Sequence, residues 1–158
     1  MFEVLMFLSE NYMDSNAGVA LKASNDTVAL ELERVGFGRL EIDRALDWLE
    51  GLVLTQKAIQ DFETPVLVKS MRFYTWDESE CLSVSGQGFL LHLEQLGILD
   101  PVTREVVIDR AMALDVCAID LKQLRWIVLM VLFSRPECKN ALMLLQEMIL
   151  AEAFDVVH

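Results

Sequence analysis

Histidine and cysteine carry much of the acid–base, nucleophilic and metal chemistry of proteins, and this chain of 158 residues has few of either. Its two histidines are His92 and His158. Its three cysteines are Cys81, Cys117 and Cys138, which are too far apart in sequence for a CxxC or zinc-binding pattern. We therefore expect reduced thiols and no catalytic, cofactor-binding or metal-binding residues. The alternative is an enzyme with a reactive thiol that His92 serves as a base.

The charge of the chain is strongly acidic. Asp and Glu number 25 against 13 Lys and Arg, which gives a formal net charge of −12. A surface of this sign repels the phosphates of nucleic acids and of anionic membranes. The longest apolar run, Trp126–Phe133, is far shorter than the roughly 20 residues that span a bilayer. Residues 1–8 include Glu3 and lack the basic region of a signal peptide. These features indicate a cytoplasmic protein that does not engage membranes.

Composition and periodicity predict a mainly α fold, with a first domain over residues 1–75. Glycine and proline are scarce, and 54% of the residues are apolar. Apolar spacing predicts one helix over residues 1–13 and another over residues 40–54. Between them, Asp26 is typical of the N-cap of a helix that ends at the glycines of residues 36–38. A helix, a short glycine-containing turn and a second helix together predict a helix-turn-helix-like unit.

Two further features of residues 1–75 bear on this interpretation. The helix that follows Asp26 is expected to turn Leu30 and Val35 inward. Val66-Leu67-Val68 and the alternating residues 71–75 favour β-strands, and a short β ribbon there would make the unit winged-helix-like.

Such a unit raises the question of nucleic-acid binding. The candidate residues for contact with nucleic acid or a partner are Arg34, Arg39, Arg44, Arg72 and Tyr74, and a basic face would also include Lys57 and Lys69. The predicted second helix, however, also carries Glu41, Asp43, Asp47 and Glu50. A recognition helix passes close to phosphates, so these carboxylates disfavour DNA or RNA and favour a protein ligand.

Residues 76–158 are predicted to form a C-terminal helical bundle of about four helices, standing apart from the first domain or packed with it as one globule. Thr75 or Asp77 is suited to cap the first of these helices. The glycines of residues 86–88 predict a break in it, and Gly97 is typical of the position after a helix end.

The remaining helices have clear starting signals. Asp100-Pro101 is typical of an N-cap followed by the first helical residue, in a helix that reaches Leu114. Asp120 opens the next helix, which is apolar on every side from Trp126 onward and is therefore expected at the centre of the bundle. A last amphipathic helix is expected over residues 137–154.

Six blocks of the sequence resemble the bacterial Smg family, in order and over nearly the whole chain. They are residues 1–8 (MFEVLMFL), 45–50 (ALDWLE), 71–75 (MRFYT), 88–95 (GFLLHLEQ), 104–110 (REVVIDR) and 126–133 (WIVLMVLF). The resemblance implies a small cytoplasmic bacterial protein with no assigned activity, so it supplies no catalytic or cofactor residues. In that family the gene commonly neighbours one for a DNA-processing protein of natural transformation, which is an association and not a mechanism.

The function predicted from these observations is that of a non-enzymatic, acidic interaction or regulatory protein. It would dock on a protein partner, and a protein of the nucleic-acid processing machinery is one candidate for that partner. The alternative is a DNA- or RNA-binding regulator that uses the helix-turn-helix-like unit. Neither the partner nor the oligomeric state follows from the sequence.

Overall fold

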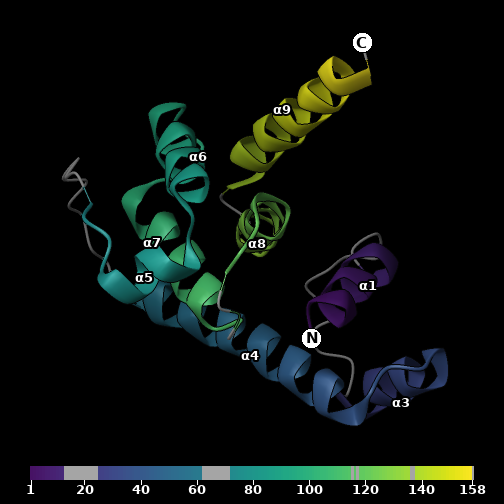
Figure 1. The fold of residues 1–158 in the computed structure, drawn as a ribbon. Coiled ribbons are helices and arrows are strands. Elements are labelled where there is room, and N and C mark those ends of the chain that lie inside the picture. The colour runs from purple at the N-terminus through teal and green to yellow at the C-terminus, as the bar shows by residue number, and fades with distance from the viewer. Residues whose placement is uncertain (13–24, 62–71, 115, 117, 136–137, 158) are drawn as a thin grey trace. The chain divides into compact units, whose positions relative to one another are not determined.

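The computed structural model describes residues 1–12, 25–61, 72–114, 116, 118–135 and 138–157. Within these ranges the chain forms eight helices and no sheet, which confirms the predicted mainly α class (Figure 1). The chain divides into two compact units, Met1–Ile59 and Gln60–His158. No helix in the part of the chain that the structure describes is long and apolar enough to cross a membrane.

The first unit contains three helices, and each of them buries apolar side chains. They are α1 (Phe2–Tyr12), α3 (Asn25–Val35) and α4 (Arg39–Asp61), the last of which runs just past the unit boundary. The buried residues are Val4, Leu5 and Leu8 of α1, Val28, Ala29 and Leu32 of α3, and Ile42, Ala45, Trp48, Leu49 and Leu52 of α4. The first and second predicted helices are therefore present, together with the one between them.

A tight turn separates α3 from α4, as the glycines at residues 36–38 predict. Gly36 has a φ of 112°, a backbone conformation that glycine adopts far more readily than other residues. The backbone N–H groups of Gly36 and Phe37 both donate to the carbonyl of Leu32, each at 3.2 Å, and so satisfy the end of α3. The Phe37 ring then packs edge-on against Phe7 of α1, with ring centroids 5.7 Å apart. The turn is thus fixed by hydrogen bonds and by an aromatic contact.

The inward face of α3 differs from the prediction. Leu30 and Val35 are 59% and 53% exposed, whereas Val28, Ala29 and Leu32 are buried. Leu30 and Leu32 are two positions apart, which places them on nearly opposite sides of a helix with 3.6 residues per turn. Large apolar side chains lie on both faces of α3, and the prediction chose the face of Leu30 and Val35 over that of Val28, Ala29 and Leu32.

The ends of these helices also correct two predictions. Because α3 begins at Asn25, Asp26 lies within its first turn and is not the N-cap. Its carboxylate there still complements the positive end of the helix dipole. The helix predicted over residues 40–54 extends to Asp61, because residues 55–61 contain no glycine or proline to end it.

The second unit is a helical bundle with α8 in the middle. Its helices are α5 (Trp76–Cys81), α6 (Val84–Gln95), α7 (Pro101–Met112), α8 (Leu121–Phe133) and α9 (Lys139–Val157). Helix α8 packs against α6, α7 and α9, and Figure 1 shows it between α7 and α9. Most of its residues from Leu124 to Leu132 are buried. The prediction that this helix would be central because it is apolar on every side is confirmed.

Capping residues define the starts of α5, α7 and α8 where the sequence predicted them. The Asp100 carboxylate accepts a hydrogen bond from the Thr103 N–H at 2.6 Å, and Pro101 follows as the first helical residue. The Asp120 carboxylate likewise accepts from the Gln123 N–H at 2.7 Å. Of the two candidates for α5, Thr75 is the N-cap. Caps are local features, so the sequence alone identified Asp100 and Asp120 and left two candidates for α5.

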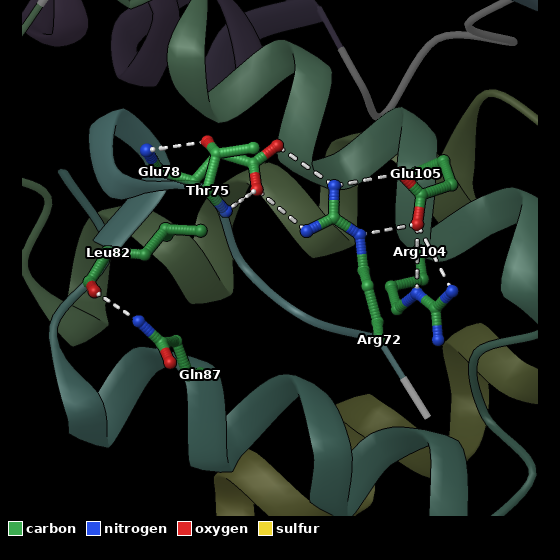
Figure 2. Close-up of polar contacts among 7 residues, drawn as sticks. All are labelled: Arg72, Thr75, Glu78, Leu82, Gln87, Arg104 and Glu105. Atoms are coloured by element: carbon green, nitrogen blue, oxygen red, sulfur yellow. Dashed lines mark hydrogen bonds and ion pairs between the residues drawn. The ribbon is translucent and has the colours of Figure 1, made fainter. Parts of the chain in front are cut away.

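The break between α5 and α6 lies at Leu82 and Ser83, not at the predicted glycines. Ser83 caps α6 by accepting a hydrogen bond from the Gly86 N–H at 3.2 Å. Figure 2 shows the Gln87 side chain, which donates to the Leu82 carbonyl at 3.0 Å. Leu82 also forms an isolated parallel bridge with Ile119. Gly86 itself lies inside α6, where a Cβ atom would be 3.2 Å from a methyl group of Leu124 on α8. This glycine therefore permits close helix packing and does not end the helix.

The predicted β ribbon is not formed by the residues that the structure describes. Residues 72–75 have no strand partner, while residues 66–68 and Met71 lie outside the described part of the chain. The alternation in residues 72–75 is nevertheless real, since Arg72 and Tyr74 are half-buried and Phe73 and Thr75 are exposed. Arg72 forms ion pairs and Thr75 caps α5, as described below, so both side chains have roles in the fold that need no sheet.

Candidate functional site around Arg72

The most extensive polar cluster in the described residues is centred on Arg72, just before α5. Its Nη1 and Nη2 atoms bind the two carboxylate oxygens of Glu78 at 2.8 and 2.9 Å. Its Nε and Nη2 atoms bind Glu105 of α7 at 2.7 and 3.1 Å (Figure 2). Bidentate pairs of this kind fix orientation as well as position. Arg72 therefore ties the start of α5 to α7.

Glu78 has a second role, because it completes a capping box with Thr75. The Thr75 hydroxyl accepts from the Glu78 N–H at 3.3 Å, and the Glu78 carboxylate accepts from the Thr75 N–H at 3.0 Å. The hydrogen bonds from Arg72 are the main reason that the pKa of Glu78 is lowered to about 2. The hydrogen bonds that Arg72 donates, to Glu78 first and to Glu105 second, raise the pKa of Arg72. Both side chains therefore remain charged at neutral pH.

Arg104 of α7 extends the cluster to α6. Its side chain is only 7% exposed; Nη1 binds Glu94 of α6 at 2.9 Å, and Nη2 lies 3.1 Å from Glu105. Glu105 thus lies between two guanidinium groups, those of Arg72 and Arg104 (Figure 2). The two arginines face three carboxylates, so the cluster as a whole is negative and offers no free cation to a phosphate.

Tyr74 completes the surroundings of Arg72. The guanidinium carbon of Arg72 lies 4.9 Å from the centre of the Tyr74 ring, within the range of a cation–π interaction. Burial is the main reason that the pKa of the Tyr74 hydroxyl is raised. Of the five predicted contact residues, the structure therefore brings Arg72 and Tyr74 together, and it uses both within the fold.

The other three predicted contact residues belong to the first unit. Arg39 pairs with Glu33 at 2.7 Å and with Asp43 at 3.5 Å, and the hydrogen bond that Arg39 donates to Glu33 is the main cause of its raised pKa. Arg34 and Arg44 are exposed and form no ion pair with another described residue. Arg39 is thus held by carboxylates, whereas Arg34 and Arg44 remain open to solvent.

Sequence reasoning missed the acidic members of the cluster and Arg104. One signal was available for Glu78, because a threonine followed three residues later by glutamate is typical of a capping box. The pairs that join Arg72 to Glu105 and Arg104 to Glu94 connect different helices, and no local pattern reveals them. They depend on how α5, α6 and α7 pack.

Three of the residues considered for thiol chemistry lie in the described structure. Cys81 and Cys138 are half-buried, and His92 is exposed on α6. Cys117 and His158 lie outside the described residues. Within the described ranges, no group of three or more His, Cys, Asp or Glu residues is placed to hold a metal ion.

The pairing of Glu78 predicts a specific dependence of stability on pH. Its pKa is lowered from 4.5 to about 2 in the folded chain, so its contribution is fully present above the unfolded value and is lost as the pH falls toward 2. Allowing for screening by water, Glu78→Gln should lower the free energy of unfolding at pH 7 by about 1 to 2 kcal/mol. The difference from the wild type should shrink steadily between pH 5 and 2, as measured by urea unfolding at a series of pH values.

Glu80→Gln is the matched control, because Glu80 is exposed on the same helix and pairs with no described residue. This variant should follow the wild-type curve. Parallel curves for the wild type and Glu78→Gln would show that the ion pair does not contribute to stability.

Together, the fold and the cluster define a small, acidic, mainly helical protein whose polar cluster holds helices together. The chain belongs to the family described as "Protein of unknown function (DUF494)", whose model matches residues 1–158. It is 42% identical to the "Protein Smg homolog" of Nitrosococcus oceani, over 99% of this chain and 96% of the relative. It is 40% identical to the "Protein Smg" of Escherichia coli O7:K1, over the full length of both. The predicted resemblance to the Smg family is confirmed. No solved structure matches the chain.

Proposed function

We propose that this protein is a non-enzymatic, cytoplasmic interaction protein that docks on a protein partner. A protein of the nucleic-acid processing machinery is one candidate for that partner. The observation that carries the proposal is the exposure of two large aromatic side chains, Phe73 and Trp76, within four residues of one another. Aromatic residues are enriched at protein interfaces and dominate their binding energy. Their exposure beside a cluster that fixes the backbone favours a binding surface.

The charge of the chain supports a protein partner over nucleic acid. The net charge is −12, and Arg39 and Arg72 are neutralised by carboxylates. Such a surface repels phosphate and attracts basic protein surfaces.

The proposal predicts that the full chain, immobilised on resin, captures one protein from native bacterial lysate in a stoichiometric amount. Gel densitometry and mass spectrometry would measure the ratio. Resin that carries an unrelated protein of similar size and net charge is the control, because it identifies the proteins that bind only by generic ion exchange. Recovery of no protein beyond that control, or of this chain alone as a homo-oligomer, would contradict docking on a different protein.

A second candidate is a DNA- or RNA-binding regulator that uses α3, the turn and α4 as a helix-turn-helix-like unit. The exposure of Arg34 and Arg44 favours it, since neither pairs with a described carboxylate. Against it, α4 also exposes Glu41, Asp43, Asp47 and Glu50. Titration with duplex and single-stranded oligonucleotides at about 20 mM salt decides between the two. Binding that weakens with salt and with Arg44→Ala would favour this candidate over protein docking.

A further inference from the structure

Phe73 and Trp76 are presented to solvent on a short segment whose neighbours are firmly held. Their side chains are 85% and 74% exposed. Arg72, directly before Phe73, is bound by two glutamates, and Thr75, directly before Trp76, caps α5. Each aromatic residue therefore follows an anchored one. Binding to groups that are already fixed loses less conformational entropy than binding to a flexible loop.

The charges next to these two rings are negative. Asp77 follows Trp76, and Glu80 lies one turn further along α5, on the same side of the helix as Trp76. Both carboxylates are exposed, and neither forms an ion pair with a described residue. The nearest described cation along the chain, Arg72, is occupied by Glu78 and Glu105. A basic segment that binds along residues 73–80 would therefore have two exposed aromatic rings and two exposed carboxylates within reach.

We propose that Phe73, Trp76, Asp77 and Glu80 form a docking surface, the aromatic–acidic surface, for a basic segment of a partner protein. Arginine or lysine side chains of the partner stack on the Trp76 and Phe73 rings, while Asp77 and Glu80 pair with the same cations. This inference rests on the proposed function and specifies the surface and the chemistry of the partner.

Charge complementarity is the reason for choosing this occupant. A second copy of the chain would bring the same acidic surface and a net charge of −12, so the two copies would repel each other. Single-stranded nucleic acid can stack bases on exposed aromatic rings, but its phosphates would face Asp77 and Glu80. A basic peptide segment satisfies both the rings and the carboxylates.

The test uses the full chain and a short synthetic peptide of alternating arginine and glycine. Isothermal titration at about 20 mM salt should show binding that weakens at about 200 mM. A glutamate–glycine peptide of equal length and an oligothymidine should not bind. Trp76→Ala and Phe73→Ala should each weaken binding about tenfold, which is typical of an aromatic hot spot. Val84→Ala is the matched control, because Val84 is 86% exposed and lies outside the surface.

The carboxylates have a separate signature. Asp77→Asn combined with Glu80→Gln should weaken binding several-fold and reduce its dependence on salt, because fewer ion pairs form. Circular dichroism would confirm that each variant keeps its helical content. Absence of peptide binding at low salt, wild-type affinity in the Trp76→Ala and Phe73→Ala variants, or equal binding of oligothymidine would each overturn the proposal.

Failure of this inference can be told apart from failure of the proposed function. If the wild-type chain captures a stoichiometric partner from lysate and the Phe73→Ala, Trp76→Ala double variant captures it equally well, docking is upheld but uses another surface. If no partner is captured by either chain, the proposed function itself is wrong.

Discussion

Replacing Ile127 by alanine should lower the free energy of unfolding of the second unit by about 3 kcal/mol. Ile127 is fully buried on α8, the helix that packs against α6, α7 and α9. Removing its side-chain atoms forfeits their transfer free energy and leaves a cavity between helices that cannot close completely. Since small domains are stable by only about 5–15 kcal/mol, this single change removes a large share of the total.

Two of the natural tryptophans report the unfolding of the two units separately. Trp126 is buried on α8 and Trp48 is buried on α4 in the first unit. Urea unfolding followed by fluorine NMR of fluorotryptophan-labelled protein gives each a separate signal. At a slope of about 2 kcal/mol per molar urea, the Trp126 midpoint should fall by about 1.5 M. Leu150→Ala is the control, because Leu150 is mostly exposed on α9 and should shift it little. An unchanged Trp126 midpoint for Ile127→Ala would contradict a central α8.

The sequence predicted several features of the fold that depend on local chemistry. Asp100 and Asp120 cap the helices that follow them, and Gly97, with a φ of 76°, follows the end of α6. Each needs only the residues within one turn. The central position of α8 was also predictable, because a helix that is apolar on every side has no face suited to water.

Two of the features that were missed depend on packing between helices. Gly86 could end a helix or allow a close approach, and only the position of Leu124 shows that it does the second. The inward face of α3 was assigned from Leu30 and Val35, but the buried residues are Val28, Ala29 and Leu32. Small residues carry little weight in a hydrophobic pattern, although they often mark where helices approach one another.

The Arg72 cluster was predictable only in part, for the same reason. Arg72 and Tyr74 were identified as contact residues, and the capping pattern of Thr75 and Glu78 could be seen in the sequence. Glu105 lies on another helix, so its pairing with Arg72 follows from how α5 and α7 pack. The prediction that these arginines contact a ligand assumes that no carboxylate of the chain pairs with them. In a chain with so many Asp and Glu residues, that assumption often fails.

Arg104 provides the second large effect, because its charge is almost completely buried. Arg104→Met keeps much of the side-chain volume but leaves Glu94 without its partner and Glu105 with only Arg72. Breaking a buried pair from one side costs more than the pair contributes, since the remaining charge stays poorly solvated. Glu94 retains some contact with water, so the expected loss is about 2 to 3 kcal/mol in the free energy of unfolding.

A double-mutant cycle separates the ion pair from the loss of packing. If the burial of unpaired charge dominates, adding Glu94→Gln to Arg104→Met should recover about 1 kcal/mol, because the uncompensated carboxylate is gone. Lys122→Met is the matched control for charge; Lys122 is exposed on α8, and its replacement should change stability little. Additive effects of the Arg104 and Glu94 variants would instead mean that Arg104 stabilises α7 through its aliphatic stem. The cluster would then remain important for packing, but it would not fix the helices by charge.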